Sequence, residues 1–470
     1  MTESRWTPVE FPAAHEVDFG RPLPPGQDPF CQPPDGFETS APGTVLRSRE
    51  VRLGFLGIVA QRVVAYQLLY RTADMRGAPQ ATVTTVIRSA HGEPDPAAPV
   101  VSYQCAIDAL ASTGFPSYLL RRHAKLAKVF GGAPAWEYVP MACALAQGWR
   151  VLVPDHGGAR GSWTAPREPG YCVLDGIRAA QGFEPAGVAR SAPVALCGYS
   201  GGGLASSWVA ELWASYAPEL NIVGAVLGAP VGDPGEIFRD LDGSLYAGLP
   251  ALALAALVRE YPGLQRIVHT HANASGQALL TRLEGTTMVG ALFRCGLRET
   301  ARYLDCPLDE ILAMPEVLEM FGELRLGQAA PAMPLLVVQA IHDQFINVRH
   351  IDTLVESYQD QGARVTYLRD RLSEHALLYP LSTPLALRWI ADRFAGEPNG
   401  YPGPQTTALL LSPRTVAGLC RVVWIVVKVA LGRQLDGPQR RWQRHAAGPR
   451  RDLRRRRRRA AADRRFARHP

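Results

Sequence analysis

Residues Pro193 to Gly203 read P-V-A-L-C-G-Y-S-G-G-G and constrain the fold more than any other stretch of the chain. Pro193 to Cys197 are apolar and few enough for a buried strand, and Leu204 to Tyr216 have the spacing of a helix. Between them, Gly198 to Gly202 fit G-x-S-x-G, the pattern of a strand–turn–helix elbow that exposes a nucleophilic serine. The glycines are needed because strand and helix approach closely at such a turn. Ser200 is therefore the candidate nucleophile.

Apolar, β-branched runs on both sides of the elbow predict further strands, separated after the first few by helical stretches of about 10–15 residues. This alternation predicts a mostly parallel, doubly wound sheet with antiparallel opening strands. The expected strands are Val63 to Arg71, Ala81 to Arg88, Pro99 to Gln104, Arg150 to Pro154, Ile222 to Ala229, Pro334 to Ala340 and Arg364 to Leu368.

The alternation stops after Pro234 and resumes after Ala330, and the interval has a helical pattern. A helical insertion between two strands predicts a lid over the site, with a second domain of no catalytic role as the alternative. We therefore expect an N-terminal arm at 1–40, a sheet-containing core at 41–233 and 331–396, a helical lid at 234–330, an extension with an amphipathic helix at 397–437 and an Arg-rich, disordered tail at 438–470.

A serine nucleophile needs a base, and the base needs a carboxylate that orients it. In a sheet of this kind the order along the chain is serine, acid, histidine, each at the carboxyl end of a strand. Asp343 follows the strand Pro334 to Ala340, and His375 follows the strand Arg364 to Leu368. We consider Asp352 and Asp360 as alternative acids, and His156 and His342 as alternative bases, all less well placed. His350 lies in a helix and is expected to be a surface or packing residue. Glu374 is expected to be a solvated loop residue.

The oxyanion of an acyl-transfer reaction is stabilised by two backbone amides near the nucleophile. The amide of Gly201, at the start of the helix after Ser200, is the first candidate. The second is expected in the loop after the strand Pro99 to Gln104, where Asp108 lies. Position alone also leaves Asp108 as a turn or helix-cap residue.

The formal net charge of +7 is unevenly distributed, because residues 438–470 hold 14 Arg against two Asp. The rest of the chain is mildly acidic, and the run of six Arg without interleaved aromatic residues argues against specific nucleic-acid binding. Thr415 to Leu431 is apolar with Arg421 and Lys428 on one helical face, which predicts peripheral membrane contact through residues 415–459. The alternative is a helix packed on the catalytic domain.

Met1 to Phe11 contain no apolar segment of the kind found in a secretory signal, so a cytoplasmic location, or one peripheral to the inner membrane surface, is expected. Eight cysteines are scattered singly, which argues against a zinc site or a disulfide framework. Cys105, Cys143, Cys172 and Cys197 lie in apolar stretches and are expected to be reduced core thiols.

Several segments together make the chain resemble the secretory lipases of the α/β-hydrolase superfamily, found in fungi and actinobacteria. They are Ala41 to Arg47, Ser102 to Gln104 with Asp108, Gly148 to Gly158, Val173 to Ala180, Gly198 to Gly202, Asp343 and His375. The resemblance covers about residues 40–395. It implies an α/β-hydrolase fold, a triad of Ser200, Asp343 and His375, oxyanion donation from Asp108 and Gly201, and a helical lid over an acyl tunnel.

These observations predict a serine hydrolase that cleaves carboxylic esters of lipids through an acyl-enzyme. We expect a small lipid or ester substrate and neither a cofactor nor a metal. One alternative is an acyltransferase that uses the same triad, and another is a non-catalytic scaffold that associates with membranes.

Overall fold

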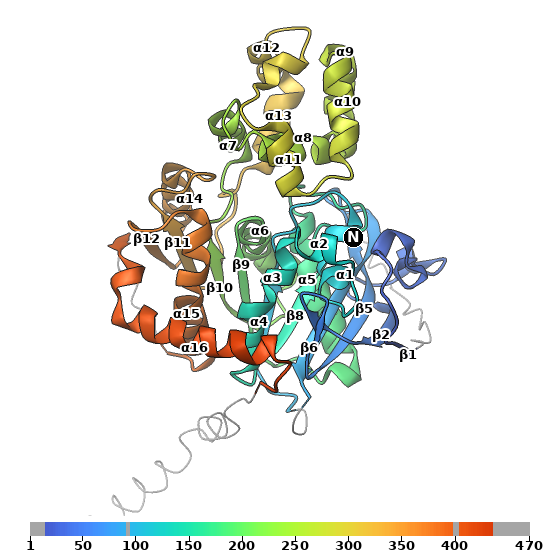
Figure 1. Ribbon diagram of the computed structural model, residues 1–470, viewed down its shortest axis with the longest axis vertical. Helices are drawn as coiled ribbons and strands as arrows, with labels where there is room; N and C mark the ends of the chain where they lie inside the picture. Colours follow the sequence, from blue (N-terminus) through green and yellow to red (C-terminus); the bar gives the residue numbers. More distant parts are fainter. Residues whose placement is uncertain (1–14, 91–94, 398–403, 436–470) are drawn as a thin grey trace, which may run out of the picture.

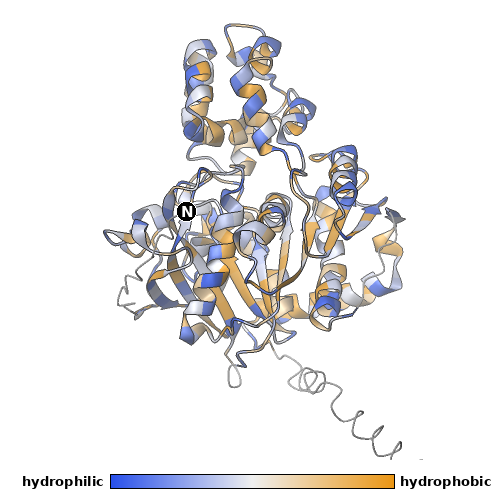
Figure 2. Ribbon diagram, turned by 180° about the vertical axis from the view of Figure 1, so that it is seen from behind, coloured by the Kyte–Doolittle hydropathy of each residue, from blue (hydrophilic) through white to orange (hydrophobic). Residues whose placement is uncertain are grey.

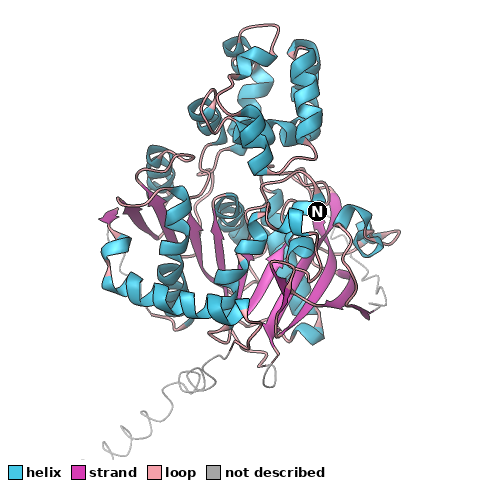
Figure 3. Ribbon diagram, viewed as in Figure 1, coloured by secondary structure: helices cyan, strands magenta, loops and turns pink. Residues whose placement is uncertain are grey.

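In the computed structural model of the chain, residues 15–90, 95–397 and 404–435 are described. They form one large twisted sheet with helices packed against it and a separate group of helices above one end (Figure 1; Figure 3). The strands lie in the order β1 (His15–Asp18), β2 (Val45–Val51), β5 (Val63–Ala73), β6 (Pro79–Ser89), β8 (Arg150–Pro154), β7 (Val100–Gln104), β9 (Val194–Tyr199), β10 (Ile222–Gly228), β11 (Leu335–Ala340), β12 (Val365–Asp370) and β13 (Gln405–Thr407). A small hairpin, β3 (Gly54–Phe55) with β4 (Val59–Ala60), lies outside this sheet.

The strands from β8 to β13 all pair in parallel, whereas β2, β5, β6 and β8 pair in antiparallel fashion. Central parallel strands are covered on both faces, and β7, β8 and β11 are accordingly buried along their whole length. Figure 2 shows these central strands as a hydrophobic layer inside the molecule. The carboxyl ends of the parallel strands meet at one edge, where loops can bring distant residues together.

Two groups of helices cover the sheet. The first packs α4 (Tyr138–Leu145), α15 (His375–Phe394) and α16 (Pro413–Ala430) against one another. The second packs α5 (Glu168–Gly182) against α6 (Gly201–Tyr216), and α14 (Val348–Asp360) contacts β11 and β12. Short helices α1 (Pro116–Leu119), α2 (Leu126–Val129) and α3 (Ala133–Trp136) lie in the long connection between β7 and α4.

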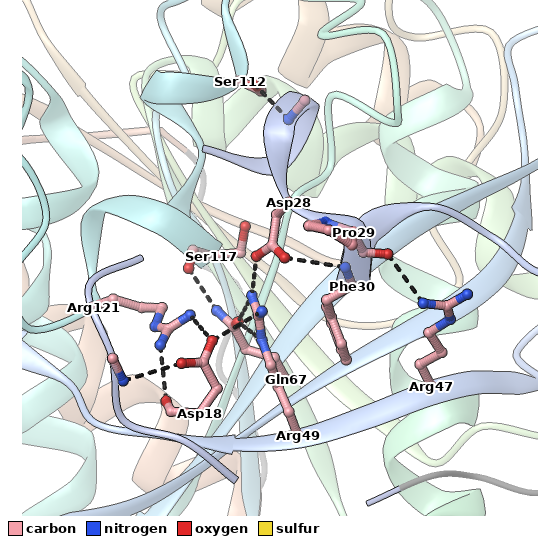
Figure 4. A network of polar contacts seen from close by, with 12 residues as sticks. Asp18, Asp28, Pro29, Phe30, Arg47, Arg49, Gln67, Ser112, Ser117 and Arg121 are labelled. Atoms are coloured by element: carbon pink, nitrogen blue, oxygen red, sulfur yellow. Dashed lines mark hydrogen bonds and ion pairs between the residues drawn. The ribbon is translucent and has the colours of Figure 1, made fainter. Parts of the chain in front are cut away.

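The N-terminal arm joins the sheet, which the sequence did not predict: β1 pairs in parallel with β2 at the sheet edge. Buried arginines hold it there (Figure 4). Asp18, at the end of β1, lies 3.2 Å from Arg49 and 2.9 Å from Arg121, and Arg49 also pairs with Asp28 at 2.7 Å. Buried guanidinium groups require such partners, so these contacts place the arm where no hydrophobic pattern would indicate a strand.

Seven helices fill the interval between β10 and β11 and lie at the top of the molecule in Figure 1. They are α7 (Pro234–Leu241), α8 (Gly248–Glu260), α9 (Pro262–His271), α10 (Ala274–Leu283), α11 (Met288–Cys295), α12 (Leu308–Leu312) and α13 (Pro315–Leu324), and we refer to them as the helical insertion. Its two ends meet. The amide of Leu326 donates to the carbonyl of Gly232 at 3.0 Å, and Arg325 pairs with Asp233 at 2.7 Å.

The C-terminal part returns to the opposite end of the molecule. After α15 and β13, α16 crosses the lower end of the body in Figure 1, far from the helical insertion. None of the helices in the described part of the chain has the length and apolar content that a membrane span needs. The Arg-rich tail at 438–470, with its predicted disorder, lies outside the described residues.

Candidate active site

Ser200 lies in the sharp turn between β9 and α6, with φ of 56° and ψ of −119°. A non-glycine residue in this region of φ is strained, and such strain is held in place by its surroundings. The surroundings are backbone: a side chain at Gly198 would collide with the carbonyl of Gly202, and one at Gly202 with the carbonyl of Gln104. The glycines of G-x-S-x-G are therefore steric requirements of this turn.

Ser200, His375 and Asp343 lie in hydrogen-bonded contact. Nε2 of His375 lies 3.0 Å from Oγ of Ser200, and Nδ1 of His375 lies 2.7 Å from Oδ2 of Asp343. The three side chains come from three loops at the carboxyl ends of β9, β11 and β12. This geometry allows the imidazole to take the serine proton while the carboxylate fixes the ring orientation.

The Asp343 side chain is fully buried, so its charge depends on donors around it. Oδ1 accepts from the amides of Phe345 and Ile346, both at 2.9 Å. Oδ2 accepts from Nε2 of Gln339 at 3.1 Å besides the histidine. These donors stabilise an ionised Asp343 and fix its orientation toward His375.

His375 is the first residue of α15, and hydrogen bonds of its backbone groups hold it in position. Its amide donates to Oε1 of Gln344 at 3.1 Å, and its carbonyl accepts from the hydroxyl of Tyr199 at 2.6 Å. Glu374, expected in a solvated loop, instead caps α15 by accepting from the amides of Ala376 and Leu377. A helix-capping side chain at this point fixes where α15 begins and thereby the position of His375.

Asp108 and Gly201 lie beside each other near Ser200: a side chain at 201 would place its Cβ 3.0 Å from Oδ1 of Asp108. Gly201 is the first residue of α6, so its amide is one of those that lack a carbonyl partner within the helix. Burial raises the pKa of Asp108 to about 6, and the nearby His375 opposes this shift.

The other candidates have structural roles or lie on the surface. Asp352 accepts from the hydroxyl of Tyr367 at 2.8 Å, and Asp360 is the last residue of α14. His156 is buried, with Nε2 2.7 Å from the carbonyl of Cys105, and burial lowers its pKa to about 4. His350 lies 3.6 Å from Asp240, a contact between α14 and the helical insertion. His342 is exposed in the turn after β11.

One buried acid near the site was missed from the sequence. Glu137 accepts a hydrogen bond at 3.0 Å from the amide of Ala106, two residues before Asp108. Burial raises the pKa of Glu137 to about 8, and the neighbouring Asp108 adds to the shift. No motif marks a single Glu before an apolar helix. Only its place as the one charged residue in W-E-Y-V-P could have drawn attention to it.

A cavity of about 420 Å³ extends from Ser200 and His375 into the helical insertion. Beside Ser200 its lining includes Asp108, Glu137 and Tyr379, whereas the lining residues of the helical insertion are apolar except for Thr300. The wall residues include Leu254, Leu257, Leu264, Ile267, Ile311, Val317, Met320, Phe321 and Leu324. Among the described residues, no group of three or more His, Cys, Asp or Glu side chains is arranged to hold a metal ion.

Comparison with known proteins gives consistent matches. The family model described as secretory lipase matches residues 126–401. A Mycobacterium tuberculosis protein named a probable inactive lipase is 53% identical over 88% of this chain and 93% of its own length. A secreted triacylglycerol lipase of Malassezia furfur is 33% identical, over 82% of this chain and 83% of its own. The crystal structure of Candida antarctica lipase A superposes with a TM-score of 0.78 at 25% identity, covering 89% of this chain and 99% of the lipase.

These matches overturn the predicted location, cytoplasmic or peripheral to the inner membrane surface. The matched family is described as secretory, and the Malassezia furfur relative is named as secreted, which points to an extracellular location. The prediction was wrong because it used only the lack of an apolar segment near Met1, and lacking this one signal does not exclude export.

Proposed function

Because the chain belongs to the secretory lipase family, we propose that it hydrolyses carboxylic esters of lipids with Ser200 as nucleophile, His375 as general base and Asp343 as the orienting acid. The observation that carries the proposal is the unbroken pair of contacts, 3.0 Å from Ser200 to His375 and 2.7 Å from His375 to Asp343. The family itself supports ester hydrolysis in general. The relative named as inactive makes a direct test of activity necessary.

The proposed reaction proceeds through an acyl-enzyme. Nε2 of His375 takes the proton of Ser200 while Oγ attacks the ester carbonyl, and Asp343 stabilises the imidazolium through Nδ1. The oxyanion is placed between the amides of Gly201 and Asp108, each of which contributes about 3 kcal/mol to transition-state stabilisation. The alcohol leaves with the proton from His375. Water, deprotonated by the same imidazole, then releases the acid.

The apolar cavity wall supports a substrate with an extended acyl chain. An acyl chain that enters the helical insertion is removed from water along its length, and each buried methylene contributes about 0.8 kcal/mol. We propose that the helical insertion therefore acts as a lid and acyl-binding domain. Asp108, Glu137 and His375 line the part of the cavity beside Ser200, where the reacting carbonyl is placed.

Hydrolysis of p-nitrophenyl esters of increasing acyl length tests the proposal. Ser200→Ala is expected to lower kcat by roughly 10⁴- to 10⁶-fold without loss of folding, which circular dichroism monitors. Asp343→Asn should lower kcat by roughly 10³- to 10⁴-fold, because the amide disrupts the tautomer that Nδ1 requires.

If no ester is hydrolysed, labelling with a fluorophosphonate distinguishes between two explanations. A folded protein that hydrolyses none of these esters but is labelled at Ser200 has a reactive nucleophile. Its substrate then lies outside the esters tested. A folded protein that is neither active nor labelled contradicts the proposed site and favours a non-catalytic role.

A further inference from the structure

One face of α16 exposes apolar side chains in a continuous stripe. Val416, Cys420, Val423, Trp424, Val427 and Leu431 recur every three or four residues and therefore share one face of the helix. Val423, Trp424 and Leu431 are 57–61% exposed, which is unusual for three large apolar side chains so close together. We call this set the α16 stripe.

The opposite face of α16 fixes the stripe in place. Thr415 and Val429 are buried, and Gly418 packs closely on Pro384 of α15. Nε2 of Gln61 donates to the carbonyl of Val429 at 3.0 Å and ties the helix to the β-hairpin side of the core. Apolar side chains therefore lie both on the face of α16 that packs on the core and on the exposed stripe.

Basic residues border the stripe along one side. Arg414, Arg421 and Lys428 are spaced by seven residues, which places them in a row along the helix. Residues 404–435 contain no Asp or Glu, and residues 438–470, further along the chain, hold 14 Arg against two Asp. Within residues 404–435, all charged side chains on and beside the stripe are therefore basic.

We propose that the α16 stripe docks the protein on a lipid surface with anionic headgroups. An apolar helical face with basic residues at its border is the pattern of helices that lie in a membrane interface, where Trp is also favoured. A second copy of the chain is a poorer partner, since it would bring two basic rows together without acidic residues between them. Binding of this kind is peripheral and requires no spanning helix.

The position of α16 separates docking from the candidate active site. The helix lies at the lower end of the body, and the helical insertion with its cavity lies at the upper end (Figure 1). A docked molecule therefore keeps its cavity clear of the surface that holds it. Docking can be measured without reference to ester hydrolysis, and neither result depends on the other.

Co-sedimentation of the full chain with vesicles tests the proposal. Vesicles of phosphatidylcholine alone are compared with vesicles of equal parts phosphatidylcholine and phosphatidylglycerol, at low and high salt. The wild-type protein should bind the anionic vesicles more tightly. Val423→Glu with Trp424→Glu should lower that binding about tenfold or more, because two charges enter the apolar contact.

Matched variants sharpen the result. Phe293→Glu, in the helical insertion at the other end of the molecule, removes an apolar side chain that is 87% exposed and should leave binding unchanged. Arg414→Gln with Arg421→Gln should weaken binding to anionic vesicles roughly fivefold for each charge and reduce its salt dependence. All these positions are exposed, so folding should be unaffected, and thermal unfolding checks this.

Two outcomes overturn the proposal. If Val423→Glu with Trp424→Glu binds anionic vesicles like the wild type, contact is made elsewhere, for example by the Arg-rich tail. If light scattering instead shows a wild-type dimer that this variant converts to a monomer, the α16 stripe is an interface between two copies of the chain.

Discussion

The turn around Ser200 and the helical insertion both contain glycine and apolar side chains, yet the two regions constrain the sequence differently. At the turn, Gly198 and Gly202 face backbone atoms that cannot move aside, such as the carbonyl of Gln104 opposite Gly202. In the helical insertion, Gly322 of α13 has open space around it, and the cavity is lined by many interchangeable aliphatic side chains.

This difference indicates that the two regions tolerate substitution to different degrees. The chemistry depends on a few backbone positions at the sheet edge, where a single added methyl group is disruptive. In the proposed function, fit to the acyl chain is spread over a wall in which no single residue dominates. Substitutions should therefore have large, all-or-none effects at the turn and graded effects in the helical insertion.

The largest contrast is expected between two glycine-to-alanine substitutions in helices. Gly202→Ala should destabilise the protein by about 3 kcal/mol or more, since its Cβ has no room beside Gln104. Gly322→Ala should stabilise it by up to about 1 kcal/mol, because alanine is the better helix former. Thermal unfolding of both variants measures the difference. If Gly202→Ala is fully stable, the turn tolerates an added side chain as well as α13 does at Gly322.

A graded effect is expected from Ile311→Trp, which adds volume in α12, at the top of the helical insertion. Hydrolysis of long-chain esters should fall roughly 10- to 100-fold in kcat/KM while short esters react as before. Glu310→Trp, on the exposed side of the same helix, is the matched control. Equal losses on long and short esters would mean that α12 does not contact the acyl chain.

The last effect is expected from Glu137, a buried acid near the turn. Its contribution to stability depends on whether its carboxyl group is protonated. Its pKa is about 8 in the folded protein against 4.5 ordinarily, so between these values the folded state binds a proton that the unfolded state lacks. Stability must then fall as pH rises through this window. Glu137→Gln should flatten the decline in Tm between about pH 6 and 8. Parallel curves for wild type and variant would show that Glu137 is ionised when folded.

Much of the fold followed from the sequence because its signals are local. The predicted α/β-hydrolase fold with a mostly parallel sheet is confirmed, and strands such as β8 and β11 read as short apolar runs. The edge strand β1 was missed because it is held by ion pairs of Asp18 with Arg49 and Arg121, which join residues far apart in the sequence.

The residues of the candidate site also fall into those that the sequence predicts and those that it does not. Ser200, Asp343 and His375 stand at strand ends in a recognisable order, so their proximity could be predicted, and their roles remain predictions. Glu137 could not be found, because its contact with Ala106 arises only when α3 and α4 pack beneath the loop after β7. The supporting amide of Gln339 belongs to a strand that reads as purely structural.

The closed base of the helical insertion has an evolutionary consequence. Because Leu326 and Gly232 are joined by a hydrogen bond and Arg325 and Asp233 by an ion pair, the segment between them departs from and returns to one point of the body. A segment tethered in this way can be shortened, enlarged or exchanged for another without disturbing strand register. Under the proposed function, descendants of this chain could therefore acquire new substrates by replacing this one segment, while Ser200, Asp343 and His375 are inherited unchanged.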